Sequence, residues 1–296
     1  MKNDVILLIT SILWGFAFVA QRAGMQYIEP FYFNAIRFFL GFLVLVPFTL
    51  IKNRSKTNLG QSNRSSIIVA IVAGLLLFMA AAFQQVGIVS TTAGKAGFIT
   101  GLYVVLVPFL SIFWSKRKPG LSSCMGAVLA ATGLFFLTIN ESFTVKKGDL
   151  LVLISALFWA VHVIYLGNKS KKVRIFQFAA IQFLTCSILS FLTALLSESL
   201  SLFQLESAII PILYGGIVSV GIAFTLQVYG QRQANPAHAA VILSLESAFA
   251  VLGGVLLLSE ILTIKAMFGC SLMLTGMILS QLGQKRLMIK EMPVSQ

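Results

Sequence analysis

The chain has 296 residues, of which 58% are hydrophobic and only 10% are charged. Soluble globular proteins are about one quarter charged, so this composition excludes a disordered chain and a nucleic-acid-binding protein and argues against a water-soluble enzyme. The formal net charge is +13, from 22 Lys and Arg residues against 9 Asp and Glu residues. The three cysteines are widely spaced and form neither a disulfide framework nor a metal-binding motif.

Apolar segments long enough to cross a bilayer follow one another along the whole chain. A helix that spans the hydrocarbon core needs roughly 20 mostly apolar residues. The first such segment is interpreted as a retained helix, because Gln21 and Arg22 follow it in place of the small residues of a signal-peptide cleavage site. The expected fold class is all-α integral membrane, with ten transmembrane helices at residues 5–21, 31–51, 67–89, 93–115, 121–139, 149–167, 175–197, 208–231, 237–258 and 262–283.

The distribution of charge predicts the orientation of these helices. Cytoplasmic connections of membrane proteins are enriched in Lys and Arg. Most basic residues fall on one side when both termini are cytoplasmic, including those at 52–64, 116–118 and 169–174. The sequence thus predicts a multi-pass protein of the cell (cytoplasmic) membrane with both termini inside. The opposite side receives most of the carboxylates, namely Glu29, Glu141, Asp149, Glu198, Glu206 and Glu260.

The two halves of the chain resemble each other at a nearly constant spacing of 142 to 145 residues. Matches between aliphatic residues arise by chance, but matches at Trp, Gln, Asp and Gly are more specific. Each half holds five predicted helices, so the second copy must be inverted in the membrane. We expect a first repeat at 1–142, a second at 143–285 and a cytoplasmic tail at 286–296. The specific matches are Asp4 with Asp149, Trp14 with Trp159, Gln85 with Gln227, Gly126 with Gly269 and Gly133 with Gly276.

Several short motifs recur along the chain. They are Trp14-Gly15, Arg37-Phe38, Thr91 to Ala96, the stretch from Pro236 through Glu246, Ser259-Glu260 and the spacing from Gly269 to Gly276. With these motifs the chain resembles a known family, the EamA-type permeases of the drug/metabolite transporter superfamily. The resemblance covers two EamA units and implies export of a small metabolite, commonly an amino acid or a related compound, across the cytoplasmic membrane. Lys116-Arg117-Lys118 departs from a Gly-Glu-Arg-like segment of the family.

Two ionisable residues are candidates for a role in transport. Glu246 is expected roughly 15 Å into the ninth helix, near the middle of the membrane. It is interpreted either as a carboxylate that couples protons or pairs with an amino group of the substrate, or as a fixed partner of Lys95 or Arg37. Lys95 either attracts a carboxylate substrate or extends to the outer headgroups. Arg37 is interpreted as structural, tying helix ends or backbone carbonyls together.

Neutral polar and aromatic residues at matching places in the two halves are further candidates. The amide side chains of Gln85 and Gln227 are interpreted as facing a cavity, where they can hold a polar solute. The alternative interpretation is that they join helices. His162 is interpreted as a hydrogen-bonded structural residue or a proton relay. The candidate substrate-binding residues are Trp14, Gln85, Lys95, Tyr103, Trp159, His162, Gln227, Ser244 and Glu246.

These features predict a secondary transporter that exports a small metabolite by alternating access through a central cavity. The expected partners are a small-molecule substrate, protons as candidate coupling ions and the lipid bilayer. No cofactor, metal, nucleic acid or enzymatic activity is expected, and no Walker motif is present for direct use of ATP. The alternative is an integral-membrane enzyme acting on a lipid, which a cluster of His, Asp or Glu at a membrane boundary would favour.

Overall fold

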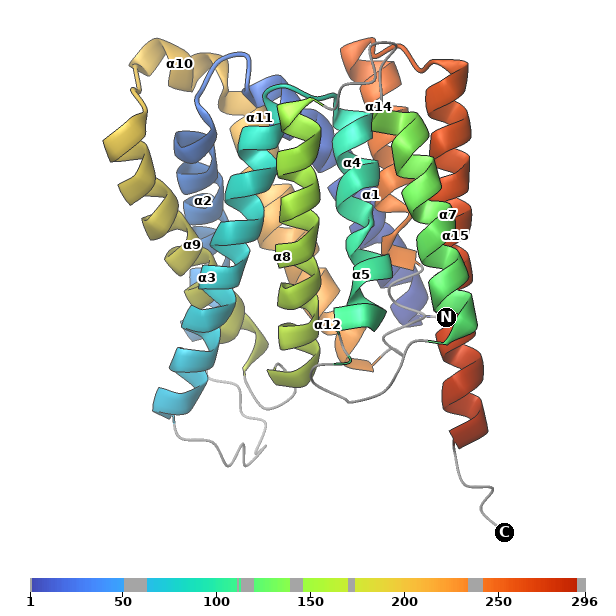
Figure 1. Cartoon of the computed structure of the whole chain (residues 1–296). Helices are drawn as coiled ribbons and strands as arrows, with labels where there is room; N and C mark the ends of the chain where they lie inside the picture. The colour runs from blue at the N-terminus through green and yellow to red at the C-terminus, as the bar shows by residue number, and fades with distance from the viewer. Residues whose placement is uncertain are drawn as a thin grey trace.

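The computed structural model describes residues 2–50, 63–110, 112, 120–138, 146–169, 174–233 and 242–291, and within these residues it contains helices and no strands (Figure 1). The predicted basic connections at 52–62, 116–118 and 171–172 lie outside the described residues, as do Pro236 and His238. Seven helical stretches in the described part are long and apolar enough to cross a membrane, and three shorter apolar helices accompany them. The chain is therefore a multi-pass helical membrane protein.

The helices follow the predicted apolar segments closely, because each segment is apolar over the length that a bilayer requires. The helices are α1 (Lys2–Gly24), α2 (Pro30–Leu50), α3 (Asn63–Ile88), α4 (Ala93–Gly101), α5 (Tyr103–Leu110), α7 (Leu121–Thr138), α8 (Lys147–Lys169), α9 (Ile175–Ser197), the short α10 (Leu202–Ser207), α11 (Ile209–Leu213), η2 (Tyr214–Ala223), α12 (Phe224–Gln233), α14 (Glu246–Leu258) and α15 (Ile264–Glu291).

Two of the apolar segments are interrupted rather than continuous, at Leu102 and Leu245. The amide of Leu102 bonds to the carbonyl of Ile99 at 3.2 Å, and the amide of Leu245 bonds to that of Ile242 at the same distance. Both are bonds to the third residue back, which tighten the helix into a 3₁₀ turn. The two interruptions lie 143 residues apart.

Close contact between α4 and α14 accompanies these interruptions. A Cβ atom on Gly101 would collide with the hydroxyl of Ser247, so only glycine permits this approach. The Ser247 hydroxyl donates a hydrogen bond to the carbonyl of Gly97 at 3.0 Å. The two interrupted segments are thus held side by side.

The segment that leads to α12 contains a π-helix, η2. Its hydrogen bonds reach five residues back, as in the bond from the Phe224 amide to the Ser219 carbonyl. Stretches of this kind are frequent at functional sites. Here η2 packs against α2, and it contributes Ser219 to the wall of the cavity described below.

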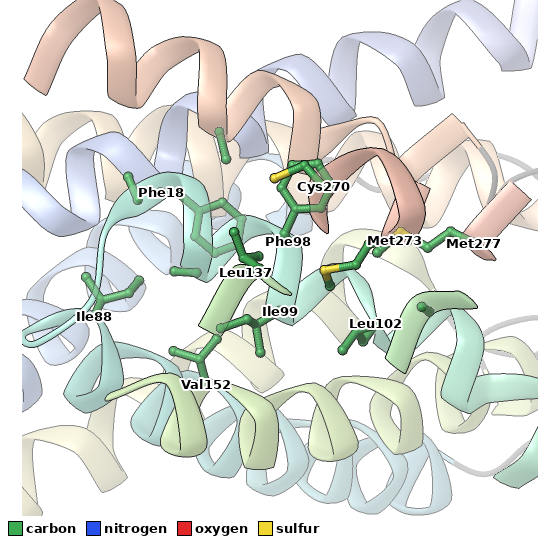
Figure 2. Close-up of a cluster of buried hydrophobic side chains, with 14 of the residues drawn as sticks. Phe18, Ile88, Phe98, Ile99, Leu102, Leu137, Val152, Cys270, Met273 and Met277 are labelled. Carbon is green, nitrogen blue, oxygen red and sulfur yellow. The ribbon is translucent and has the colours of Figure 1, made fainter. Parts of the chain in front are cut away.

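Hydrophobic packing joins α1, α4, α7, α14 and α15 on one side of the molecule (Figure 2). Phe98 and Ile99 of α4 lie in this cluster with Met273 and Met277 of α15. Elsewhere α2 packs on α9 and α3 packs on α8, while large apolar side chains such as Leu196 and Ile210 stay exposed. An apolar exterior of this kind is what a lipid environment requires.

Candidate functional site

A cavity with a volume of about 50 Å³ lies among the helices, and residues of α1, α2, α3, α4, α5, α8, η2, α12 and α14 form its wall. The wall combines aromatic rings with a small number of polar groups, which is typical of small-molecule sites. Its aromatic residues are Trp14, Phe18, Phe38, Tyr103, Trp159 and Phe224. Its polar residues are Gln21, Arg37, Gln84, Thr100, Ser219, Gln227 and Glu246.

The structure brings together part of the predicted set of site residues. Trp14, Tyr103, Trp159, Gln227 and Glu246 all line the cavity. The other four predicted residues, Gln85, Lys95, His162 and Ser244, are not part of its wall.

The two tryptophans of the repeat lie on either side of one phenylalanine. The ring of Phe224 is 4.8 Å from that of Trp14 and 5.9 Å from that of Trp159, measured between centroids. The indole N–H of Trp14 donates to the carbonyl of Ser219 at 3.3 Å. The tryptophans therefore have fixed orientations and form a rigid aromatic wall.

The helix interruptions place Tyr103 and Glu246 at the cavity. Each is the first residue after its interruption, at the start of α5 and α14 respectively. The Tyr103 side chain lies close enough to Glu246 for electrostatic interaction with its carboxyl group. Glu246 is 3% exposed, and no ion pair reaches it within the described residues. Interrupted helices that meet inside a membrane protein commonly form binding sites for solutes and ions.

A chain of amide hydrogen bonds extends along the cavity from Trp159. Its indole N–H donates to Gln84 Oε1 at 2.6 Å, and Gln84 Nε2 donates to Gln21 Oε1 at 2.9 Å. Neither glutamine was predicted as a site residue. Gln84 adjoins the predicted Gln85, and neighbouring residues of a helix project about 100° apart, so only one of the two can face the cavity.

Gln85 lies in the packed interior beside this chain. It is fully buried, and its Nε2 donates to the backbone carbonyl of Gln21 at 3.4 Å. Gln227 is 2% exposed and, unlike Gln85, lines the cavity. The Oε1 atoms of both glutamines have no hydrogen-bond partner in the described part of the chain. An unpartnered buried acceptor is costly, so Gln227 is well suited to receive a donor from a solute.

Opposite effects are therefore expected from alanine at the two matched glutamines. Gln227→Ala should weaken solute binding about three- to tenfold, the value of one neutral hydrogen bond, and leave the melting temperature near that of the wild type. Gln85→Ala should lower the melting temperature and change the affinity less than about twofold. Thermal-shift titration with a solute that stabilises the wild-type protein measures both. Equal affinity in Gln227→Ala and the wild type would contradict the assignment.

Lys95 forms an ion pair away from the central cavity. Its Nζ lies 3.8 Å from Asp149 Oδ2, and the hydroxyl of Thr91 donates to the other oxygen of the same carboxylate. The suggestion that Lys95 is the fixed partner of Glu246 is therefore wrong. Lys95 instead lines a second cavity, with a volume of about 340 Å³, that Glu260 and Lys265 also line.

His162 and Ser244 are buried near the cavity without lining it. The Nε2 atom of His162 lies 3.3 Å from Gln182 Oε1, and its ring stands edge-on to that of Trp159 at 5.8 Å. This contact matches the interpretation of His162 as a hydrogen-bonded residue that supports packing. Ser244 lies in the turn just before α14.

Carboxylates join distant helices at one end of the molecule, where Figure 1 places α10 and the end of α14. Glu260 accepts hydrogen bonds from the amides of Ala93 and Gly94 at 2.6 and 3.1 Å. Glu198 accepts from Phe31 and Tyr32, both at 2.8 Å. In each case a carboxylate closes the positive end of a helix from the other half of the chain.

A further contact lies beside Glu198. The Glu29 carboxylate accepts a hydrogen bond from the amide of Ser199 at 3.1 Å. The connection before α2 and the connection after α9 are therefore bonded to each other. Burial raises the pKa of Glu198 above its ordinary value, and the negative charge of Glu29 adds to this, while the bonds from Phe31 and Tyr32 oppose it. A partly desolvated carboxylate therefore makes the contact between the end of α9 and the start of α2.

The long apolar helices define a multi-pass membrane protein, and the cavity lined by polar and aromatic side chains is its candidate site for a small molecule. The chain belongs to the EamA-like transporter family, whose sequence profile matches residues 1–139 and 146–282. The predicted family is thereby confirmed. By its family, the protein is a membrane transporter, and the relatives described next are named as transporters.

Relatives of similar length extend over most of the chain. A protein of Archaeoglobus fulgidus described as an uncharacterized transporter is 31% identical over 280 residues, 94% of this chain and 85% of that protein. The uncharacterized transporter YoaV of Bacillus subtilis is 23% identical over 275 residues, 91% of this chain and 93% of that protein. A crystal structure matches with a TM-score of 0.70 and 21% identity over 97% of this chain and 98% of that chain, which shows a shared fold.

Proposed function

We propose that the protein is a secondary transporter that exports a small metabolite, an amino acid or a related compound, across the cytoplasmic membrane by alternating access. The single observation that carries the proposal is the central cavity, to which both halves of the chain contribute polar and aromatic residues. Matched positions of the two halves, Trp14 with Trp159 and Tyr103 with Glu246, meet at this cavity. Alternating access needs a site of this kind, shared by two similar units.

The proposal includes ten membrane crossings in two inverted five-helix units, 1–142 and 143–285, with both termini cytoplasmic. The interruptions at Leu102 and Leu245 support it because they fall at equivalent places of the two units. The contacts of Glu198 and Glu260 with the starts of α2 and α4 support it further. In this arrangement the contacts close the outer end of the cavity, and the equivalent inner connections are rich in Lys and Arg.

The chemistry of the cavity wall supports a solute with an apolar body and a few polar groups. Two tryptophans and three phenylalanines offer flat apolar surface, while Gln227 and Thr100 offer hydrogen-bonding atoms without partners among the described residues. No group of three or more His, Cys, Asp or Glu side chains suitable for a metal occurs in the described part of the chain. The wall therefore favours binding and release of an unchanged solute.

A flux assay tests the proposed function. The purified protein is first screened against metabolites by thermal shift, because a ligand of the folded state raises its melting temperature. A solute so identified is then loaded, labelled, into sealed proteoliposomes. We expect exchange with external solute at least about tenfold faster than in protein-free liposomes, with the solute recovered chemically unchanged. Conversion of the solute, or of a lipid, would instead support an enzyme.

The direction of transport and the membrane topology are tested separately. Accumulation of the solute inside inside-out vesicles, whose cytoplasmic face is turned to the medium, would support export. Cysteine labelling should place residues 52–64 and 198–206 on opposite faces of the membrane. Labelling of both segments from one face would contradict the inverted arrangement.

A further inference from the structure

Arg37 of α2 is a buried cation in the wall of the central cavity. Its side chain is 3% exposed. The guanidinium lies over two aromatic rings, at 4.8 Å from the centroid of Phe38 and 5.5 Å from that of Phe33. The sequence interpretation of Arg37 as a tie between helix ends did not anticipate this place in the cavity.

The hydrogen bonds of Arg37 fix its Nε atom and leave its two terminal nitrogens for another partner. Its Nε donates to Asn34 Oδ1 at 2.9 Å, and Asn34 Nδ2 donates to the carbonyl of Ala81 at 3.1 Å, which fixes the asparagine. Within the described residues, no carboxylate lies within 4.0 Å of the guanidinium. The two terminal nitrogens, which carry four of the five N–H groups of an arginine, are not used by these contacts.

A buried guanidinium without an anionic partner is unusual, because a buried charge is normally paired. The aromatic faces of Phe33 and Phe38 stabilise the cation only partly. Glu246 lines the same cavity from α14 but lies beyond ion-pair distance. The two charges of the cavity are thus separate, and each is left to face a solute.

We propose that Arg37 is the anion-binding residue of the central cavity and that the solute carries a carboxylate or a phosphate, which pairs with the terminal nitrogens. A guanidinium keeps its proton at physiological pH and presents two parallel N–H groups that match either anion. The aromatic wall of Trp14, Trp159 and Phe224 then receives the apolar body of the solute. This inference rests on the proposed function, since it assigns a role within the same cavity.

Matched acids and amides test the assignment with the purified full-length protein in carboxylate-free and phosphate-free buffer. The probes are acetate, 3-phenylpropanoate and indole-3-propanoate, their primary amides, and phenyl phosphate. Thermal-shift titration should show stabilisation by at least one anion and at least about tenfold weaker binding of its neutral counterpart, since hydrogen bonds to charged groups are the stronger ones. Stabilisation by phenyl phosphate alone would identify phosphate as the anion. Equal stabilisation by acids and amides, or none by any anion, would overturn the assignment.

Two variants separate charge from packing. Arg37→Gln should reduce the affinity for the binding anion tenfold to a hundredfold, while Arg37→Lys, which keeps the charge but loses the paired N–H groups, should recover part of it. Anion affinity that is unchanged in Arg37→Gln would overturn the proposal. If Arg37→Gln fails to fold, the acid-to-amide comparison in the wild type and the Arg37→Lys affinity still decide the question.

Failure of this inference is distinguishable from failure of the proposed function. If proteoliposomes exchange a neutral amide while no anion binds, the transporter proposal stands and the role of Arg37 falls. If anions bind in a manner that depends on Arg37 but no solute exchanges across the membrane, the role of Arg37 stands and the transporter proposal falls.

Discussion

Replacing Glu246 with Gln is expected to abolish proton-driven accumulation of the solute while leaving solute exchange intact. The carboxyl group of Glu246 is buried at the cavity, at the first residue of α14, and no fixed cation pairs with it in the described part of the structure. A carboxyl group placed in this way can bind a proton when the cavity faces one side and release it when the cavity faces the other. Glutamine keeps the shape and the hydrogen bonding but carries no exchangeable charge.

The size of the effect follows from the driving force. A pH difference of one unit stores about 1.4 kcal/mol per proton, which supports up to a tenfold solute gradient for one proton per solute. Proteoliposomes with the wild-type protein should approach that ratio, and those with Glu246→Gln should stay near one. Both proteins should still exchange labelled for unlabelled solute without a pH difference.

Two control variants sharpen this measurement. Glu246→Asp keeps a carboxyl group and should retain part of the accumulation. Glu206→Gln, at an exposed residue of α10, should behave as the wild type. Proton-driven accumulation by Glu246→Gln at the wild-type level would remove Glu246 from the coupling mechanism.

Replacing Glu260 with Ala is expected to loosen the contact between the end of α14 and the start of α4 and so to open the molecule at this end. Glu260 joins the connection after α14 to the first amides of α4 through two hydrogen bonds. Hydrogen bonds to a charged acceptor contribute about 1.5–3 kcal/mol, and the positive end of a helix adds to their strength. Loss of about 2 kcal/mol shifts a two-state equilibrium roughly thirtyfold toward the open arrangement.

Cysteine labelling measures this opening directly. Ala96 of α4 is fully buried and lies one turn from these contacts, so Ala96→Cys reports access between α4 and α14. The native Cys124, Cys186 and Cys270 are removed first. An impermeant maleimide should label this position at least about tenfold faster in the Glu260→Ala protein.

Glu206→Ala provides the matched control, because Glu206 is an exposed carboxylate at the same end of the molecule. This variant should label as slowly as the protein with Glu260 intact. Unchanged labelling of a folded Glu260→Ala protein would show that the carboxylate does not hold this end closed.

The helices, the family and part of the cavity could be predicted from sequence because the signals are local or repeated. Apolar runs of sufficient length identify the membrane helices without any knowledge of packing. The repeat placed Trp14 and Trp159, and Gln85 and Gln227, at equivalent positions, and all of these except Gln85 line the cavity. The position of Glu246 within a long apolar segment marked it as a candidate in the same way.

The sequence could not show which of two neighbouring residues faces the cavity. Gln84 and Gln85 are adjacent, and only the rotation of α3 against α1 and α8 decides that Gln84 reaches the cavity. Because the period of a helix is 3.6 residues, an all-apolar segment carries almost no information about which face is turned inward.

The partners of the charged residues also depend on contacts between distant parts of the chain. Composition and spacing by themselves determined that this is a helical membrane protein with two similar halves and an excess of positive charge. Only the tertiary structure paired Lys95 with Asp149, joined Glu260 to the start of α4 and left Arg37 facing the cavity. The physical reason is that a buried charge is stabilised by whichever groups surround it in space, and in this molecule those groups come from helices far apart in the chain.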